Sequence, residues 1–161
     1  MGKNKPKPGR NDYLSRSTIH IREVGIDAKT DEKSRSVELS FSSASAIQRY
    51  DWWSGETFSE VLSHSRKAVE LKRLQDFGVA LFNHNPDKVI GRLSDVRLDE
   101  KEGKCRCRIT FDEDAASEEI YQKVLSGTLR GVSVGYRVSE WEEIKRGKVS
   151  SEGIKGPAMI A

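Results

Sequence analysis

The feature that most constrains this sequence of 161 residues is the alternation of apolar and polar side chains in short runs that end at turn residues. Val89–Leu98 and Cys105–Phe111 both alternate, and the segment Asp99–Gly103 between them is polar and contains a glycine. Alternation places apolar side chains on one face of a strand, and a polar turn with glycine joins antiparallel neighbours. These segments therefore predict a β-hairpin and a mainly-β protein.

Further segments follow the same logic. Thr18–Val24 and Arg35–Phe41 alternate on either side of a charged turn, which predicts an antiparallel pair. Ser42–Ser54 shows no sustained period and is expected to be a long ordered loop. Thr57–His64 has a threonine and a glutamate in capping-box spacing, which favours a helical turn or two.

The clearest helix lies between two predicted strands. Asp112–Gly127 has apolar residues at helical spacing, acidic residues at its start and a glycine at its end. Gly131–Val138 returns to a strand pattern, and Gly156–Ala161 is typical of a strand that has just begun. We expect one domain over 17–161, a barrel or half-closed sheet with helices on its outside.

Cys105 and Cys107 lie two apart in an alternating run, so both are expected to point into the core as free thiols. No further Cys or His follows at ligand spacing, so we expect no metal site and no cofactor. Residues 1–16 are basic and contain two prolines and two glycines, and we expect a disordered tail. No apolar run is long enough for a membrane span, and the compartment is expected to be cytosolic.

Nucleic-acid binding is an alternative that the aromatic residues raise. Tyr50, Trp52 and Trp53 lie near Arg49, and aromatic rings beside cations can hold single strands. Asp51 interrupts this group, and the net charge is only +3. We therefore favour packing of the rings into the core over a nucleic-acid site.

Ser133 is the candidate nucleophile because Gly131 and Gly135 flank it and permit close approach to its backbone. A plain strand of small residues has the same composition. The spacing matches the nucleophile elbow of α/β-hydrolases, but that motif requires a helix directly afterwards. Here Tyr136–Val138 continues as a predicted strand, so we reject that fold.

The chain has three histidines, and each has a structural interpretation. His20 lies within an alternating strand, and His64 lies at the end of a predicted helical turn, where the helix dipole favours a cation. His84 lies in a turn between two asparagines, directly after an apolar strand. A rigid and exposed position of this kind suits a general base, although a surface turn histidine would fit it as well.

Several motifs in this order resemble the tailed-phage prohead proteases, a family of capsid-maturation serine proteases. They are Phe82–Asn85, Val89–Gly91 and Leu129–Tyr136, with Ser40–Ser43, Val69–Leu74 and Arg49 upstream, so the resemblance covers most of the chain from about Thr18 onward. The resemblance implies a β-barrel similar to that of the herpesvirus capsid-assembly proteases.

The resemblance also implies a function. Ser133 would attack the peptide carbonyl, and His84 would accept its proton. The substrates and partners would be scaffold and major capsid protein inside the immature head in the host cytoplasm, with self-cleavage and a homodimer as features of such proteases. A non-catalytic capsid-assembly protein that binds scaffold is the alternative.

A third residue normally orients the histidine in such sites. The family carries an acid in a strand beyond the serine motif, and this sequence ends before that strand, so a chain truncated at its C-terminus and weakly active alone is expected. His64, His20 and Glu140 are the substitutes that the sequence offers, and a Ser-His-His arrangement in related capsid proteases suggests one of the two histidines.

Overall fold

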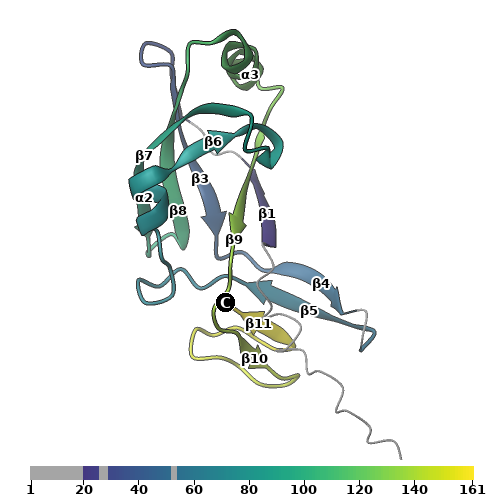
Figure 1. The fold of residues 1–161 in the computed structure, drawn as a ribbon. Helices are drawn as coiled ribbons and strands as arrows, with labels where there is room; N and C mark the ends of the chain where they lie inside the picture. The colour runs from purple at the N-terminus through teal and green to yellow at the C-terminus, as the bar shows by residue number, and fades with distance from the viewer. Residues whose placement is uncertain (1–19, 26–28, 52–53) are drawn as a thin grey trace, which may run out of the picture. The chain divides into compact units, whose positions relative to one another are not determined.

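The computed structural model describes residues 20–25, 29–51 and 54–161. The chain forms two compact units, and Figure 1 shows their strands. Unit 1 combines Ser45–Ser63 with Tyr136–Ala161, and unit 2 combines Ile21–Ala44 with His64–Gly135. The predicted basic tail at 1–16 and the two adjacent tryptophans lie outside the described residues.

Unit 2 is built on a five-stranded antiparallel sheet with the strand order β2-β3-β8-β7-β6. Its strands are β2 (Lys29–Asp31), β3 (Ser36–Ser43), β6 (Val79–Leu81), β7 (Val89–Asp99) and β8 (Lys104–Phe111). The predicted hairpin is confirmed as β7 and β8, and its turn needs glycine because Gly103 has φ of 59°.

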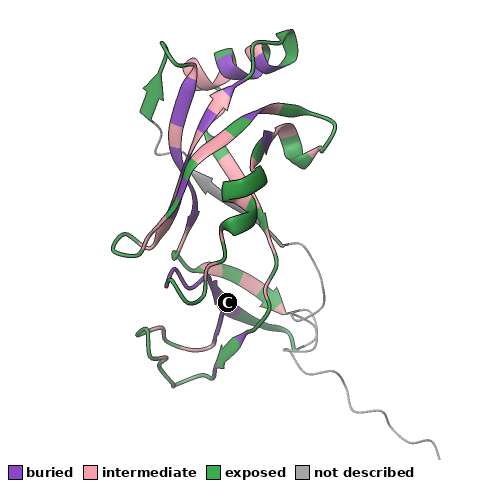
Figure 2. Ribbon diagram, turned by 60° about the vertical axis from the view of Figure 1, so that its left-hand side comes forward, coloured by how far each residue is buried: buried purple, intermediate pink, exposed green. Residues whose placement is uncertain are grey.

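The core of unit 2 follows from the alternation along β3 and β8 (Figure 2). On β8 the residues that alternate into the core are Cys105, Cys107, Ile109 and Phe111. The prediction of two free buried thiols on one face is confirmed. Burial raises the pKa of Cys105 to about 11 and that of Cys107 to about 12, because the thiolate would lose its hydration.

Two helices pack against this sheet, α2 (Lys72–Phe77) and α3 (Ala115–Leu125). The predicted helix is confirmed as α3. Asp114 caps it by accepting hydrogen bonds from the backbone N–H groups of Ala116 and Ser117, which satisfies two donors that have no partner within the helix.

A two-stranded sheet pairs β1 (His20–Gly25) with β9 (Gly131–Tyr136). The predicted pairing of Thr18–Val24 with Arg35–Phe41 is therefore wrong, since β3 pairs with β2 and β8 instead. Alternation identifies a strand but says nothing of its partner, and adjacency in sequence is only a tendency.

Unit 1 contains a four-stranded sheet with the order β10-β11-β5-β4. Its strands are β4 (Ile47–Asp51), β5 (Glu56–Val61), β10 (Glu142–Ile144) and β11 (Ala158–Ile160). The predicted loop at Ser42–Ser54 and the predicted helical turn at Thr57–His64 are thus both wrong. Local capping-box spacing was outweighed by strand pairing, because β5 pairs with both β4 and β11.

The predicted strand near residue 160 is confirmed as β11, which runs parallel to β5 and antiparallel to β10. Ala158, Met159 and Ile160 are all buried, as expected for a strand with a neighbour on each side. Phe58 and Trp141 complete a cluster around Met159.

The expected mainly-β class with flanking helices is confirmed. Of the sheets that the described residues form, none closes into a barrel, so the herpesvirus-protease-like barrel is not seen in them. Among the helices of the described residues, none has the length and apolar character to cross a membrane.

Candidate active site

Ser133 occupies the middle of β9, where the period of two sets its direction. Val132 and Val134, its neighbours, pack against the core of unit 2. Side chains alternate across a strand, so the half-buried Ser133 projects from the face opposite to these valines. The hydroxyl of Ser133 thus lies on a strand that Val132 and Val134 fix to the core of unit 2.

His84 lies in a tight turn, Phe82–His84, that follows β6. The turn is closed by a hydrogen bond from the Asn85 backbone N–H to the Phe82 carbonyl, with an N···O distance of 3.1 Å. Asn83 and His84 have φ of 52° and 54°, in the left-handed region that asparagine tolerates better than most residues. Such backbone strain is frequent at functional sites, and here it holds an exposed imidazole in a defined position.

The fold brings the two candidate residues together. Ser133 Oγ lies 2.7 Å from His84 Nε2, although the residues are 49 positions apart in the sequence. With the proton of the ring on Nδ1, the hydroxyl donates to Nε2 and the imidazole is placed to accept its proton. This geometry is the one that activates a serine for attack on a carbonyl.

His64, the candidate third residue that lies in the same unit as His84, forms no hydrogen bond with the His84 ring in the structure. His64 is buried in unit 2, and its Nε2 lies 3.1 Å from Ser42 Oγ. Glu140 is an exposed residue of unit 1, and the side chain of His20 lies outside the described residues. Within the described part of the chain, no carboxylate and no second histidine bonds to the His84 ring. An orienting role for any of these residues stays a prediction.

Sequence reasoning missed a buried polar network in unit 1. The Glu60 carboxylate, whose side chain is 3% exposed, accepts two hydrogen bonds from the Arg49 guanidinium at 3.2 Å and one from the Tyr136 hydroxyl at 2.7 Å. The hydrogen bond to Glu60 raises the pKa of Arg49 further, since the charged form is the one that donates.

This network bears on the site because Tyr136 is the last residue of β9, three positions after Ser133. Its hydroxyl therefore ties the end of the strand that carries the candidate nucleophile to Glu60. Arg49 and Tyr136 were recognised as parts of a motif, but Glu60 was interpreted as a capping residue. A buried carboxylate needs donors, and the strand pairing that supplies them was not predicted.

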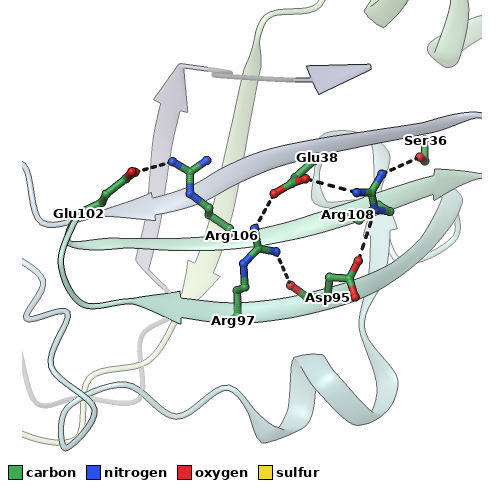
Figure 3. Close-up of polar contacts among 7 residues, drawn as sticks. All are labelled: Ser36, Glu38, Asp95, Arg97, Glu102, Arg106 and Arg108. Atoms are coloured by element: carbon green, nitrogen blue, oxygen red, sulfur yellow. Dashed lines mark hydrogen bonds and ion pairs between the residues drawn. The ribbon is translucent and has the colours of Figure 1, made fainter. Parts of the chain in front are cut away.

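A second polar cluster lies on the sheet of unit 2 (Figure 3). Arg97 of β7 and Arg108 of β8 both bind the Glu38 carboxylate of β3, and Arg108 also binds Asp95. The hydrogen bond from Arg97 lowers the pKa of Glu38 below its usual range. These arginines are paired with carboxylates across neighbouring strands, and cross-strand pairs of opposite charge stabilise a sheet.

Comparison with known proteins identifies the relatives of this chain. A family model described as caudovirus prohead serine protease matches residues 28–154. A protein of Halomonas phage phiHAP-1 named major capsid protein is 32% identical over 111 residues, which make up 67% of this chain. The match spans only 17% of the length of that protein. No solved structure matches the chain significantly.

Proposed function

This chain belongs to the caudovirus prohead serine protease family, and from that premise we propose that it is a serine endopeptidase with Ser133 as nucleophile and His84 as general base. The observation that carries the assignment is the distance of 2.7 Å between Ser133 Oγ and His84 Nε2. A serine without an adjacent base is a poor nucleophile at neutral pH.

The proposed reaction begins with the attack of Ser133 Oγ on the carbonyl carbon of the scissile peptide bond. His84 Nε2 takes the hydroxyl proton and then gives it to the leaving amine, so that the acyl-enzyme forms and the new amino terminus departs. Water, deprotonated by the same nitrogen, then hydrolyses the ester and restores the serine. In this proposal the hydroxyl of Ser133 and the imidazole of His84, which are hydrogen-bonded to each other, carry the proton transfers.

The proposed substrates are segments of the scaffold and of the major capsid protein, cleaved within the immature phage head, with cleavage of the chain itself in the same place. Two facts support this choice. The family is one of prohead proteases, and the phiHAP-1 relative bears the name of a capsid protein. Because the related segment makes up 17% of that relative, we propose that the domain works on capsid polypeptides in close association with them.

The test is co-expression of this chain with the scaffold and major capsid protein of the same phage. We expect shortened forms of the partners with the parent chain, and only full-length partners with Ser133→Ala or His84→Ala. Ser94→Ala is a matched control, because Ser94, like Ser133, is a half-buried serine within a strand of unit 2. Processing that survives both site substitutions would disprove the assignment.

The same capsid-named relative also favours a second candidate function. In that case the chain binds scaffold or capsid protein during assembly and does not cut it. The co-expression experiment separates the two, since stable association without any shortened partner would support the binding function. A fluorophosphonate probe that labels the parent chain and leaves Ser133→Ala unlabelled would support the protease.

A further inference from the structure

Strand β6 is an outer strand of the five-stranded sheet and ends three residues before His84 (Figure 1). Within the described residues, β7 is its only strand neighbour. Leu93 N–H donates to the Gly78 carbonyl and Phe82 N–H donates to the Lys88 carbonyl, both at 3.0 Å. Along an outer antiparallel strand, every second residue directs its backbone N–H and C=O groups toward the neighbouring strand, and the residues between direct theirs away from it. Gly78 and Phe82 direct theirs toward β7, so Val79 and Leu81 direct their backbone groups away from β7.

The side chains on this edge are unusually apolar. Ala80 is buried, whereas Val79 is 46% exposed and Val89, whose strand partner is Leu81, is 43% exposed. Phe77, at the end of α2, is 82% exposed. We call Phe77, Val79 and Val89 the edge patch.

Outer strands normally carry charges that prevent another strand from pairing with them. The other outer strands of the two larger sheets follow this rule: β2 contains Lys29 and Asp31, β4 contains Arg49 and Asp51, and β10 contains Glu142 and Glu143. The sequence of β6 is Val-Ala-Leu, with no charge. An exposed apolar edge without this protection is the kind of edge to which an extended peptide adds.

We propose that β6 binds the protein substrate by strand addition, and that the edge patch selects segments with apolar side chains at alternate positions. The inference rests on the proposed function, because continuity with His84 is what identifies the occupant as substrate. Leu81 is three residues from His84, and a strand advances about 3.3 Å per residue, so an extended segment that pairs with β6 reaches the catalytic pair within about 10 Å.

The experiment measures binding without catalysis, in the full chain with Ser133→Ala. The probes are two fluorescein-labelled peptides of ten residues, one with valine at every second position and one with serine in those positions. We expect the valine peptide to bind at least about tenfold more tightly, because the apolar contact area is lost in the serine peptide. In NMR spectra of the ¹⁵N-labelled chain, the valine peptide should shift the amide signals of Val79 and Leu81.

Four variants, of which Val149→Ser is the control, locate the contact. Phe77→Ser should weaken binding of the valine peptide about fivefold or more, whereas Val149→Ser, which removes a side chain that is 59% exposed in unit 1, should not. Val79→Pro should abolish binding, because it removes an outward N–H without breaking the bonds to β7. Val79→Ala, which keeps the N–H, should retain part of the affinity.

Equal binding of the two peptides would overturn the inference, and so would unchanged binding of the valine peptide by Val79→Pro. Amide shifts that depend on protein concentration in the absence of peptide would also overturn it, because they would assign the edge to a second copy of the chain. Cleavage is scored separately, by co-expression of the parent chain with the scaffold and major capsid protein. Selective binding at β6 without cleavage would reject the proposed protease function and support the peptide-binding site. Cleavage without selective binding would support the protease function and reject the peptide-binding site at β6.

Discussion

The buried network of Arg49, Glu60 and Tyr136 gives the sharpest prediction about stability. Arg49→Met removes the cation and two of the three hydrogen bonds to a carboxylate that is 3% exposed. A buried charge that loses its partner costs about 3–5 kcal/mol of folding free energy. Tyr136→Phe removes the hydrogen bond from the tyrosine hydroxyl to the Glu60 carboxylate, and a hydrogen bond to a charged group is worth about 1.5–3 kcal/mol.

The double variant Arg49→Met/Glu60→Met is the decisive comparison. It removes the charge together with its partner, so it should cost much less than Arg49→Met alone, and replacements of this kind can even be neutral. Urea unfolding, followed by tryptophan fluorescence, to which the buried Trp141 in the same unit contributes, measures the difference. With a slope of about 2 kcal/mol per molar urea, the single variant should unfold about 2 M earlier than the parent.

The result that would refute this reasoning is a double variant at least as unstable as Arg49→Met. That outcome would mean that Arg49 acts through the packing of its aliphatic stem and not through its charge. Glu60→Gln provides the matched control, because it keeps the shape of the side chain and one acceptor oxygen while it removes the charge.

Three further predictions concern unit 2. Burial raises the pKa of Cys105 to about 11 and of Cys107 to about 12, so the unfolded chain ionises first as pH rises from about 9. The contribution of these two thiols to the stability of the parent should therefore be constant below pH 9 and fall between pH 9 and 12, by up to about 1.4 kcal/mol per thiol and pH unit. The Cys105→Ala/Cys107→Ala variant should lack this component in urea unfolding at each pH. Hydrogen bonds, first that from the Ser117 hydroxyl, lower the pKa of Asp114. The helix cap that this carboxylate forms is therefore present at neutral pH and is lost as the carboxylate is protonated. Asp114→Ala should lower the melting temperature by a few degrees at pH 7, with little difference from the parent near pH 2. Asn83→Val places a β-branched residue at a φ of 52° and should lower the cleavage rate by shifting His84, while Asn83→Gly should retain most activity, as measured by processing of the capsid protein.

The parts of the fold that the sequence predicted are those that local patterns determine. The hairpin of β7 and β8 has alternating strands and a glycine turn, and α3 has its cap and its apolar spacing within fifteen residues. Two of the elements that prediction missed, β4 and β5, are short strands whose hydrogen bonds come from each other and from β11, about a hundred residues later in the chain. Non-local pairing overrides local preference in such segments.

The candidate site divides in the same way. Ser133 and His84 could be chosen from local features, a strand of small residues and a turn after an apolar strand. A local pattern could not state that the two side chains meet, because this depends on the placement of β9 relative to the His84 turn. The resemblance to a known family supplied that information, and the structure gives the distance.

Glu60 shows what kind of information a single sequence lacks. In the segment Thr57–Glu60 the glutamate fits a capping box, where it would be exposed and would need no cation. In the sheet, Arg49 lies opposite Phe58, so Glu60 is its diagonal neighbour on the same face of β5, and the two side chains meet. Burial then makes the ion pair obligatory, because an isolated carboxylate would not stay charged there. A glutamate at this spacing thus needs no cation in a helix cap but needs a cationic partner in the sheet. The strand that pairs with the segment determines which of the two structures forms.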